Sequence, residues 1–152
     1  MSAKRESARG SGESRAERDA AGVPKRTVMV VESDNALRRL LVRCVRRKGF
    51  TVREATNARE ALAEGEWHGG EVSLLITDPR VLRTRDHLLL RWLVAANPQC
   101  RILLVLECQH PEANDNPLPG FPPGRLGFIR KPFDRLAFTA KVDELLGLPR
   151  LN

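Results

Sequence analysis

Charged residues follow the short apolar runs of this sequence, at positions where they could act together. They are Glu32 and Asp34 after residues 27–31, Asp78 after 72–77, Glu107 after 101–106, and Lys131 after 127–130. If the runs are neighbouring parallel strands, their carboxyl ends meet at one edge of a sheet, where sites form in such folds. Carboxylates are the ligands that hard cations such as Mg²⁺ prefer, and a lysine ammonium is a compact positive charge. The pattern therefore indicates a site of carboxylates and one lysine.

The apolar runs alternate with segments of helical periodicity. Strands are predicted at 27–31, 50–55, 72–77, 101–106 and 127–130, and helices at 36–48, 57–64, 84–96 and 134–146. The first helix is predicted to pack through apolar residues that share one face, namely Leu37, Leu40, Leu41, Cys44 and Val45. Strands that alternate with helices predict an α/β fold, a three-layer, doubly wound parallel sheet with right-handed crossovers.

A proline-rich segment breaks this alternation. Residues 109–124, between the fourth and fifth predicted strands, contain five prolines and two glycines. Because proline interrupts helical hydrogen bonding, we expect a loop in place of most or all of the fourth helix. Residues 117–123 resemble a polyproline docking segment, but a semi-rigid connector is the favoured interpretation.

The chain has the length of one domain with a tail. Residues 1–24 have no large apolar residue between Met1 and Val23, so we expect them to be disordered. Residues 26–147 form the predicted domain, and 148–152 its C-terminal end. Because the chain stops shortly after the last predicted helix, we expect no attached output domain.

Positive charge is in excess, with 26 Lys and Arg against 19 Asp and Glu and a formal charge of +7. The basic residues are dispersed through the tail and the helices, with one local concentration in the first predicted helix, at Arg38, Arg39, Arg43, Arg46, Arg47 and Lys48. A solvated helix face is favoured here over a nucleic-acid contact, which needs a continuous patch. Nucleic acid is therefore not an expected partner.

The sequence gives no support for several classes of protein. Cys44, Cys100 and Cys108 form no CxxC pair and have no histidine at zinc-ligand spacing, so we expect reduced thiols in a cytoplasmic protein. No apolar stretch reaches the roughly 20 residues of a membrane span. The motifs of hydrolases, dinucleotide enzymes and P-loop proteins are absent from the sequence.

Three motifs, in order, resemble the receiver domain of bacterial response regulators. Residues 30–39 (VVESDNALRR) are similar to the receiver opening, 74–78 (LLITD) to its phosphoacceptor strand, and 130–133 (RKPF) to its conserved-lysine turn. The resemblance covers about residues 26–147 and implies a flavodoxin-like receiver fold with five parallel strands. It also implies two-component signalling in the cytoplasm.

The resemblance assigns a role to each charged position. Asp78 would accept a phosphoryl group, and Lys131 would neutralise its charge. Glu32, Asp34 and the backbone carbonyl of Arg80 would join Asp78 around Mg²⁺. A carboxylate nucleophile needs a cation to approach an anionic donor. For Asp78 and Lys131 the alternatives are an ordinary turn aspartate before proline and a solvent-facing lysine.

The sequence departs from the receiver pattern at the metal site. Receivers place two adjacent acids after the first strand, and Ser33 stands where the second would be the direct metal ligand. A neutral hydroxyl is a poor ligand for a hard cation, so any Mg²⁺ binding is expected to be weak. Asp34 could replace the missing acid, but capping the following helix is the favoured role.

The switch positions depart as well. Leu106 stands where receivers carry a threonine or serine that hydrogen-bonds the phosphoryl group. Thr77 cannot replace it, because neighbouring strand residues point to opposite faces and Asp78 must face the site. Phe128 takes the place of the aromatic switch residue, although a core role is favoured for it.

Three functions follow for this atypical receiver. The first is a stand-alone phosphorelay receiver in which Asp78 is phosphorylated and whose partner is a histidine kinase or phosphotransfer protein. The second is a pseudo-receiver, a binding or scaffold module that works without phosphorylation. The third and most distant is a binder of nucleic acid or an anionic surface through the first helix and tail. No enzymatic activity is expected beyond self-phosphorylation from a phosphodonor.

Overall fold

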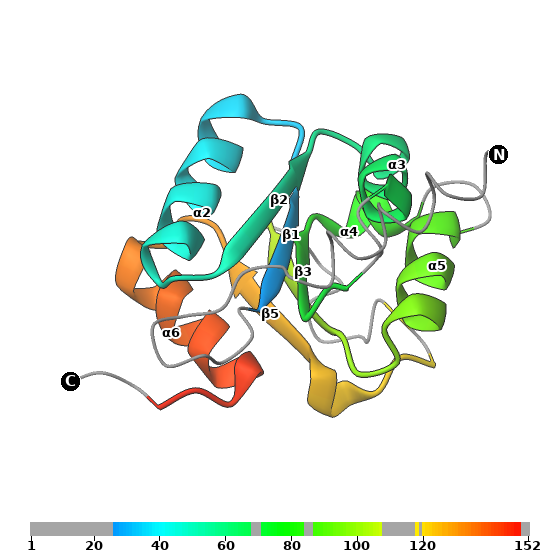
Figure 1. Ribbon diagram of the computed structural model, residues 1–152. Coiled ribbons are helices and arrows are strands. Elements are labelled where there is room, and N and C mark those ends of the chain that lie inside the picture. The colour runs from blue at the N-terminus through cyan, green and yellow to red at the C-terminus, as the bar shows by residue number, and fades with distance from the viewer. Residues whose placement is uncertain (1–25, 68–70, 84–86, 108–117, 119, 150–152) are drawn as a thin grey trace, which may run out of the picture.

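A five-stranded parallel sheet forms the centre of the molecule in the computed structural model (Figure 1). The structure describes residues 26–67, 71–83, 87–107, 118 and 120–149. Its elements, in chain order, are β1 (Thr27–Val31), α2 (Asn35–Arg47), β2 (Thr51–Ala55), α3 (Ala58–Trp67), β3 (Leu74–Thr77), α4 (Pro79–Leu82), α5 (Leu88–Ala96), β4 (Arg101–Leu106), η3 (Pro123–Arg125), β5 (Leu126–Arg130) and α6 (Arg135–Leu146). The strand order is β2-β1-β3-β4-β5, and the predicted doubly wound fold is confirmed.

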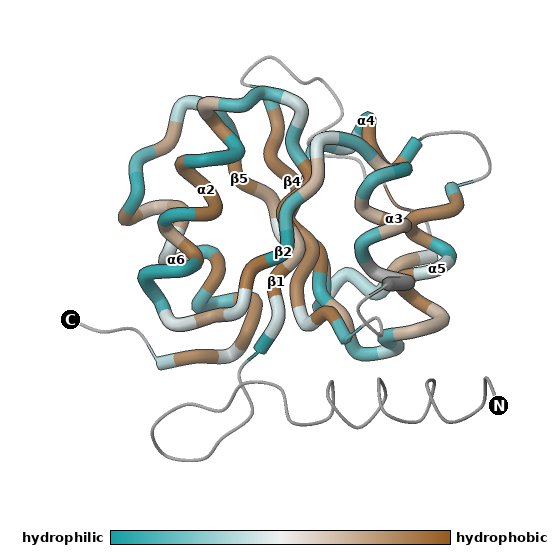
Figure 2. The backbone as a smooth tube through the Cα atoms, turned by 45° about the horizontal axis from the view of Figure 1, so that its top comes forward, coloured by the Kyte–Doolittle hydropathy of each residue, from teal (hydrophilic) through white to brown (hydrophobic). Residues whose placement is uncertain are grey.

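Helices cover both faces of the sheet. Figures 1 and 2 show α2 and α6 on one face and α3, α4 and α5 on the other. In β1, Val28 and Val30 pack toward α2 and α6, whereas Met29 and Val31 pack toward the opposite helices. All four side chains are fully buried. A strand buried on both faces has no polar side, which is why the central strands appear in the sequence as unbroken apolar runs.

The first helix lies within one residue of its predicted bounds at each end, but its buried face is different. Asp34 is the N-cap of α2, and Gly49 follows its last turn with a φ of 90° that favours glycine. Leu40, predicted to lie in the core, is 44% exposed, whereas Val42 is 3% exposed. The prediction for Leu40 was wrong because α2 turns Val42, and not Leu40, into the core cluster on this face of the sheet.

The predicted helix 84–96 is also corrected. A short helix, α4, starts directly after Asp78 with Pro79 at its first position, where proline needs no amide partner. The longer helix α5 begins only at Leu88, after His87 in a left-handed conformation with φ 48°. Residues 84–86 lie outside the described residues. The helix α3 extends to Trp67, beyond the predicted end at residue 64.

The end of the proline-rich segment packs into the core. Leu118 and Phe121 are 6% and 7% exposed and belong to the cluster beneath α3 and α5. A single turn of 3-10 helix, η3, then leads into β5. Residues 109–117 and 119 of that segment, the predicted tail 1–24, Cys108 and residues 150–152 lie outside the described residues. None of the described helices is long and apolar enough to cross a bilayer.

A half-buried ion pair joins α2 to α6. The Lys48 Nζ lies 2.7 Å from Asp143 Oδ1, outside hydrogen-bond geometry, and donates a hydrogen bond to Oδ2 at 2.9 Å. The side chains are only 19% and 9% exposed. A charge that loses its partner in such a place is left poorly solvated, so this pair constrains how the two helices lie together.

Removing one member of this pair should therefore destabilise the domain. We expect Lys48→Met to lower the free energy of unfolding by about 3 kcal/mol, and Lys48→Met combined with Asp143→Leu to recover most of that loss. Urea denaturation followed by circular dichroism measures both. The matched control is Lys141→Met, which removes an exposed contact to Glu144 at 3.5 Å and should cost less than about 0.5 kcal/mol. Equal losses for Lys48→Met and Lys141→Met would contradict this account.

Candidate functional site

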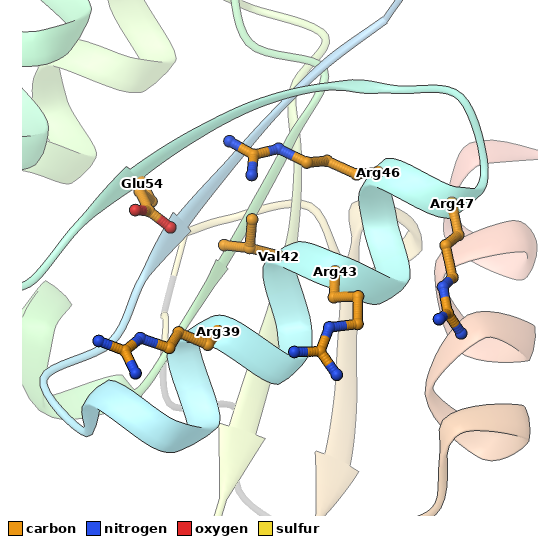
Figure 3. Close-up of a pocket in the computed structure, with 6 residues that line it drawn as sticks. All are labelled: Arg39, Val42, Arg43, Arg46, Arg47 and Glu54. Carbon is orange, nitrogen blue, oxygen red and sulfur yellow. The ribbon is translucent and has the colours of Figure 1, made fainter.

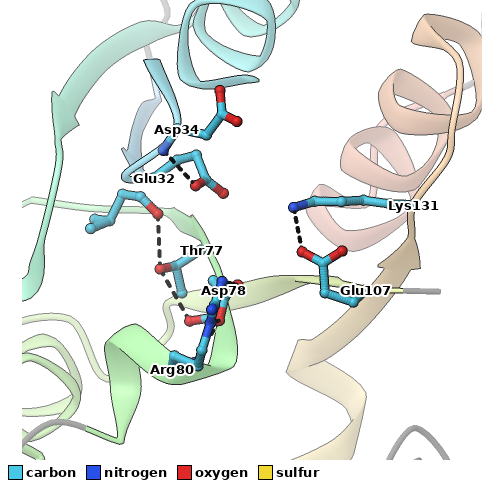
Figure 4. A network of polar contacts seen from close by, with 8 residues as sticks. Glu32, Asp34, Thr77, Asp78, Arg80, Glu107 and Lys131 are labelled. Atoms are coloured by element: carbon cyan, nitrogen blue, oxygen red, sulfur yellow. Dashed lines mark hydrogen bonds and ion pairs between the residues drawn. The ribbon is translucent and has the colours of Figure 1, made fainter. Parts of the chain in front are cut away.

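The carboxylate of Asp78 lies at the carboxyl edge of the sheet, at the end of β3 (Figure 4). The residue is 6% exposed. Its Oδ1 accepts a hydrogen bond from the backbone N–H of Arg80 at 2.7 Å, which caps α4. The Asp-Pro sequence therefore has a local role, since it ends the strand and starts a helix.

The guanidinium of Arg80 also binds this carboxylate. Its Nε donates to Asp78 Oδ1 at 3.1 Å, and its Nη2 donates to Oδ2 at 2.9 Å. This is the side-on geometry in which arginine binds a carboxylate with two parallel hydrogen bonds. Both oxygens of Asp78 are thus in contact with a cation from its own chain.

The ion pair decides the protonation of Asp78. Burial of the carboxyl raises its pKa, but the hydrogen bonds from the Arg80 side chain and backbone, the charge of Arg80 and finally that of Lys131 hold the pKa below its usual value of 3.8. The hydrogen bond and charge of Asp78 likewise raise the pKa of Arg80 against the effect of burial, with Glu107 and Glu32 adding to the rise. Asp78 is therefore an ionised carboxylate at neutral pH.

The lysine of the edge has a different partner. Lys131 Nζ forms an ion pair with Glu107 Oε1 at 2.8 Å and not with Asp78 (Figure 4). Glu107 follows β4, and Lys131 follows β5. The backbone N–H of Lys131 donates to the carbonyl of Leu106 at 2.9 Å, which holds the ends of the two strands together. The sequence marked Glu107 as a strand-end charge without a role, and the pairing of β4 with β5 supplies that role.

The two acids after β1 point in different directions. Glu32 is 4% exposed, and its Oε2 accepts a hydrogen bond from the backbone N–H of Asp34 at 2.9 Å. The Asp34 carboxylate turns away and accepts from the N–H of Leu37 at 2.9 Å, so it caps α2. Of the two roles left open by the sequence, Asp34 has the helix cap in this structure.

Comparison with known proteins gives this arrangement a family context. No protein-family model matches the chain. The sensor kinase CckA of Brucella abortus (strain 2308) is 32% identical over 120 residues, which are 79% of this chain and 12% of that protein. The solved receiver domain of hybrid histidine kinase CckA has a TM-score of 0.58 at 22% identity, covering 79% of this chain and 98% of that one. A response regulator receiver protein from Burkholderia phymatum has a TM-score of 0.66 at 20% identity, covering 82% and 98%.

The chain is a response-regulator receiver domain. It spans about one eighth of the curated kinase that it matches. Glu32, Asp78 and Lys131 lie at the positions where the resemblance places receiver residues, and the fold brings them to one edge of the sheet.

The magnesium ion that the receiver resemblance implies does not fit these residues. Among the described residues, no group of three or more histidine, cysteine, aspartate or glutamate side chains is placed to hold a metal. Ser33 is exposed and has no carboxylate, Asp34 caps a helix, and the guanidinium of Arg80 lies against both oxygens of Asp78. The carboxylate that would bind the cation is already neutralised by an arginine.

The switch positions of this receiver are part of the core. Leu106 is 1% exposed, and Phe128 packs partly buried against the same cluster. The hydroxyl of Thr77, itself 1% exposed, donates to the carbonyl of Val31 at 3.0 Å across the sheet. Thr77 therefore has a structural partner in β1, and its hydroxyl is not directed at the Asp78 carboxylate.

Removing the guanidinium should raise the pKa of Asp78. We expect Arg80→Ala to shift its titration midpoint upward, because burial would then act with less opposition. NMR titration of the carboxyl carbon measures this, with Arg91→Ala on α5 as a control that should leave the midpoint unchanged. In the unmodified protein the folded pKa lies below the unfolded one, so the pair stabilises the fold at neutral pH, and this contribution is lost as the pH falls through the folded pKa. An unchanged midpoint in Arg80→Ala would contradict the assignment.

Proposed function

We propose that this receiver domain works as a pseudo-receiver, a cytoplasmic binding module of two-component signalling whose contacts do not require phosphorylation of Asp78. The observation that carries this proposal is the side-on pairing of Arg80 with both oxygens of Asp78. A carboxylate that attacks a phosphoryl donor needs a free oxygen and a cation that also binds the donor. Arg80 neutralises the carboxylate but covers the oxygens that would react.

The charges at the site support the same conclusion. Asp78 is paired with Arg80, and Lys131 is paired with Glu107 at 2.8 Å. A phosphoryl group would have to displace the guanidinium from Asp78 and draw Lys131 away from Glu107, with Leu106 offering no hydrogen bond in return. Each of these steps opposes modification, and none is compensated by a residue in the described part of the chain.

The partner that we propose is a histidine kinase or phosphotransfer protein, because the curated relative is a sensor kinase. A receiver that keeps the fold but pairs its ionised carboxylate with its own arginine can bind such a partner without being phosphorylated. In this role the domain has no enzymatic activity of its own.

A second candidate is the phosphorelay receiver. It is favoured by the ionised state of Asp78 and by the position of Lys131, whose charge contributes to lowering the Asp78 pKa. Arg80 is the residue that decides between the two functions, since its side chain is 76% exposed and free to leave the carboxylate when a stronger competitor arrives.

Incubation with a small phosphodonor and millimolar Mg²⁺ tests the proposal. We expect no mass increase in the unmodified protein and no shifts of amide signals around Asp78 on addition of beryllofluoride. The comparison set is Asp78→Asn, Arg80→Ala, and Ser33→Asp combined with Arg80→Ala, which restores the second acid and removes the guanidinium. Modification of this double variant alone would show that these two positions disable the site.

Phosphorylation of the unmodified chain that disappears in Asp78→Asn would overturn the pseudo-receiver proposal and establish the relay function. Circular dichroism of each variant ensures that loss of modification is not loss of folding.

A further inference from the structure

One face of α2 consists of arginines without acidic neighbours on the helix. The segment Asn35–Arg47 contains no aspartate or glutamate. Figure 3 shows the exposed arginines around a shallow hollow with Val42 at its floor and Glu54 of β2 on the far side. The hollow is lined by Arg39, Val42, Arg43, Arg46, Arg47 and Glu54.

These arginines are unpaired within the described part of the chain. Arg38 donates to the carbonyl of Glu32 and to the Asn35 side chain. The side chains of Arg39, Arg43, Arg46 and Arg47 form no hydrogen bond or ion pair with any described residue. Their charges are therefore available to a ligand.

The stability of α2 does not explain why these arginines lie in a row along one face. Cations in the last turn complement the helix dipole, which accounts for Arg46 and Arg47 only. Arg43 has a like charge four residues away on each side, at Arg39 and Arg47, and like-charged pairs at this spacing destabilise a helix. An ordinary solvated face mixes both signs, as α6 does with Lys141 and Glu144.

We infer that this arginine face of α2 binds the phosphate backbone of nucleic acid without reading its sequence. Guanidinium groups bind phosphate side-on through two hydrogen bonds. From Arg39 to Arg47 the helix advances about 12 Å at 1.5 Å per residue. One strand of a duplex carries a phosphate about every 3.4 Å along its axis, so the row faces three or four phosphates.

Phosphate fits this face better than an acidic protein surface does. Arginine is common at protein interfaces, but the buried centre of such an interface is largely apolar. Here the centre is made of arginines, and the apolar residue between them, Val42, is 3% exposed. Glu54 limits the site on the β2 side, where a neighbouring hollow is lined by Glu54, Glu60 and Glu64. The inference is independent of the state of Asp78, because these side chains belong to a different face.

The test is fluorescence anisotropy with the full chain and a labelled duplex of arbitrary sequence at several salt concentrations. With about four phosphates neutralised, we expect affinity to fall on the order of a hundredfold between 50 and 200 mM salt. Arg43→Glu should weaken binding at least tenfold at 50 mM salt and reduce the salt slope by about one or more. Its melting temperature should be unchanged or higher, since the new glutamate pairs with Arg39 and Arg47. Glu54→Gln should strengthen binding.

The matched control is Arg91→Glu, which makes the same charge change at an exposed position of α5 on the opposite face of the sheet. It should alter binding less than twofold. The inference is overturned by absence of binding at 50 mM salt, by an unaffected Arg43→Glu, or by equal losses in Arg43→Glu and Arg91→Glu. Competition by polyglutamate as effective as that by the duplex would also overturn it, in favour of an acidic protein partner.

Discussion

In a parallel sheet that is buried on both faces, the carboxyl ends of the strands lie at one edge. Carboxylates that follow those strands are brought close together there, and each buried one needs a hydrogen-bond donor or a cation. In this receiver Glu32 and Asp78 are 4% and 6% exposed at that edge. Buried carboxylates are tolerated only when they are hydrogen-bonded or paired. The backbone N–H of Asp34 donates a hydrogen bond to Glu32, and Arg80 donates three hydrogen bonds to Asp78. The start of α4 and the pairing of Lys131 with Glu107 are consistent with this neutralisation.

The receiver scaffold is kept where packing requires it and changed where the chemistry would take place. The central strands still fill two apolar layers, and the ion pair of Lys48 with Asp143 joins the two helices of one layer. Ser33 and Leu106 alter neither layer, since Ser33 is exposed and Leu106 joins the core. At these two positions the receiver pattern has a metal ligand and a hydroxyl.

The edge that carries Asp78 and the outer face of α2 are separate surfaces, and they differ in whether their cations have acidic partners. At the edge Arg80 and Lys131 each have an acidic partner within about hydrogen-bond distance. On α2 the cations have no such partners and their fields add. The two surfaces can therefore act independently.

Local patterns in the sequence predicted most of the fold. The apolar runs 27–31 and 101–106 coincide with β1 and β4, because strands covered on both faces need continuous hydrophobicity. The cap at Asp34 and the glycines after α2 and α6 depend on neighbouring residues only, so they too could be predicted. The gathering of charges at one edge followed from strand order alone.

Only the tertiary structure decided how those charges pair and which way the helices face. Periodicity places Leu40 and Val42 of α2 within one helix, but the packing of α2 on the sheet decides that Val42 is buried and Leu40 exposed. Likewise, the spacing of Asp78 and Arg80 permits many rotamers, and the side-on pair depends on the turn into α4. The sequence by itself determined the elements and the edge at which the charges lie, because those follow from local hydrophobicity and backbone chemistry. The pairing of Arg80 with Asp78 and of Lys131 with Glu107 was decided by tertiary structure, because it depends on distances between side chains that no local pattern contains.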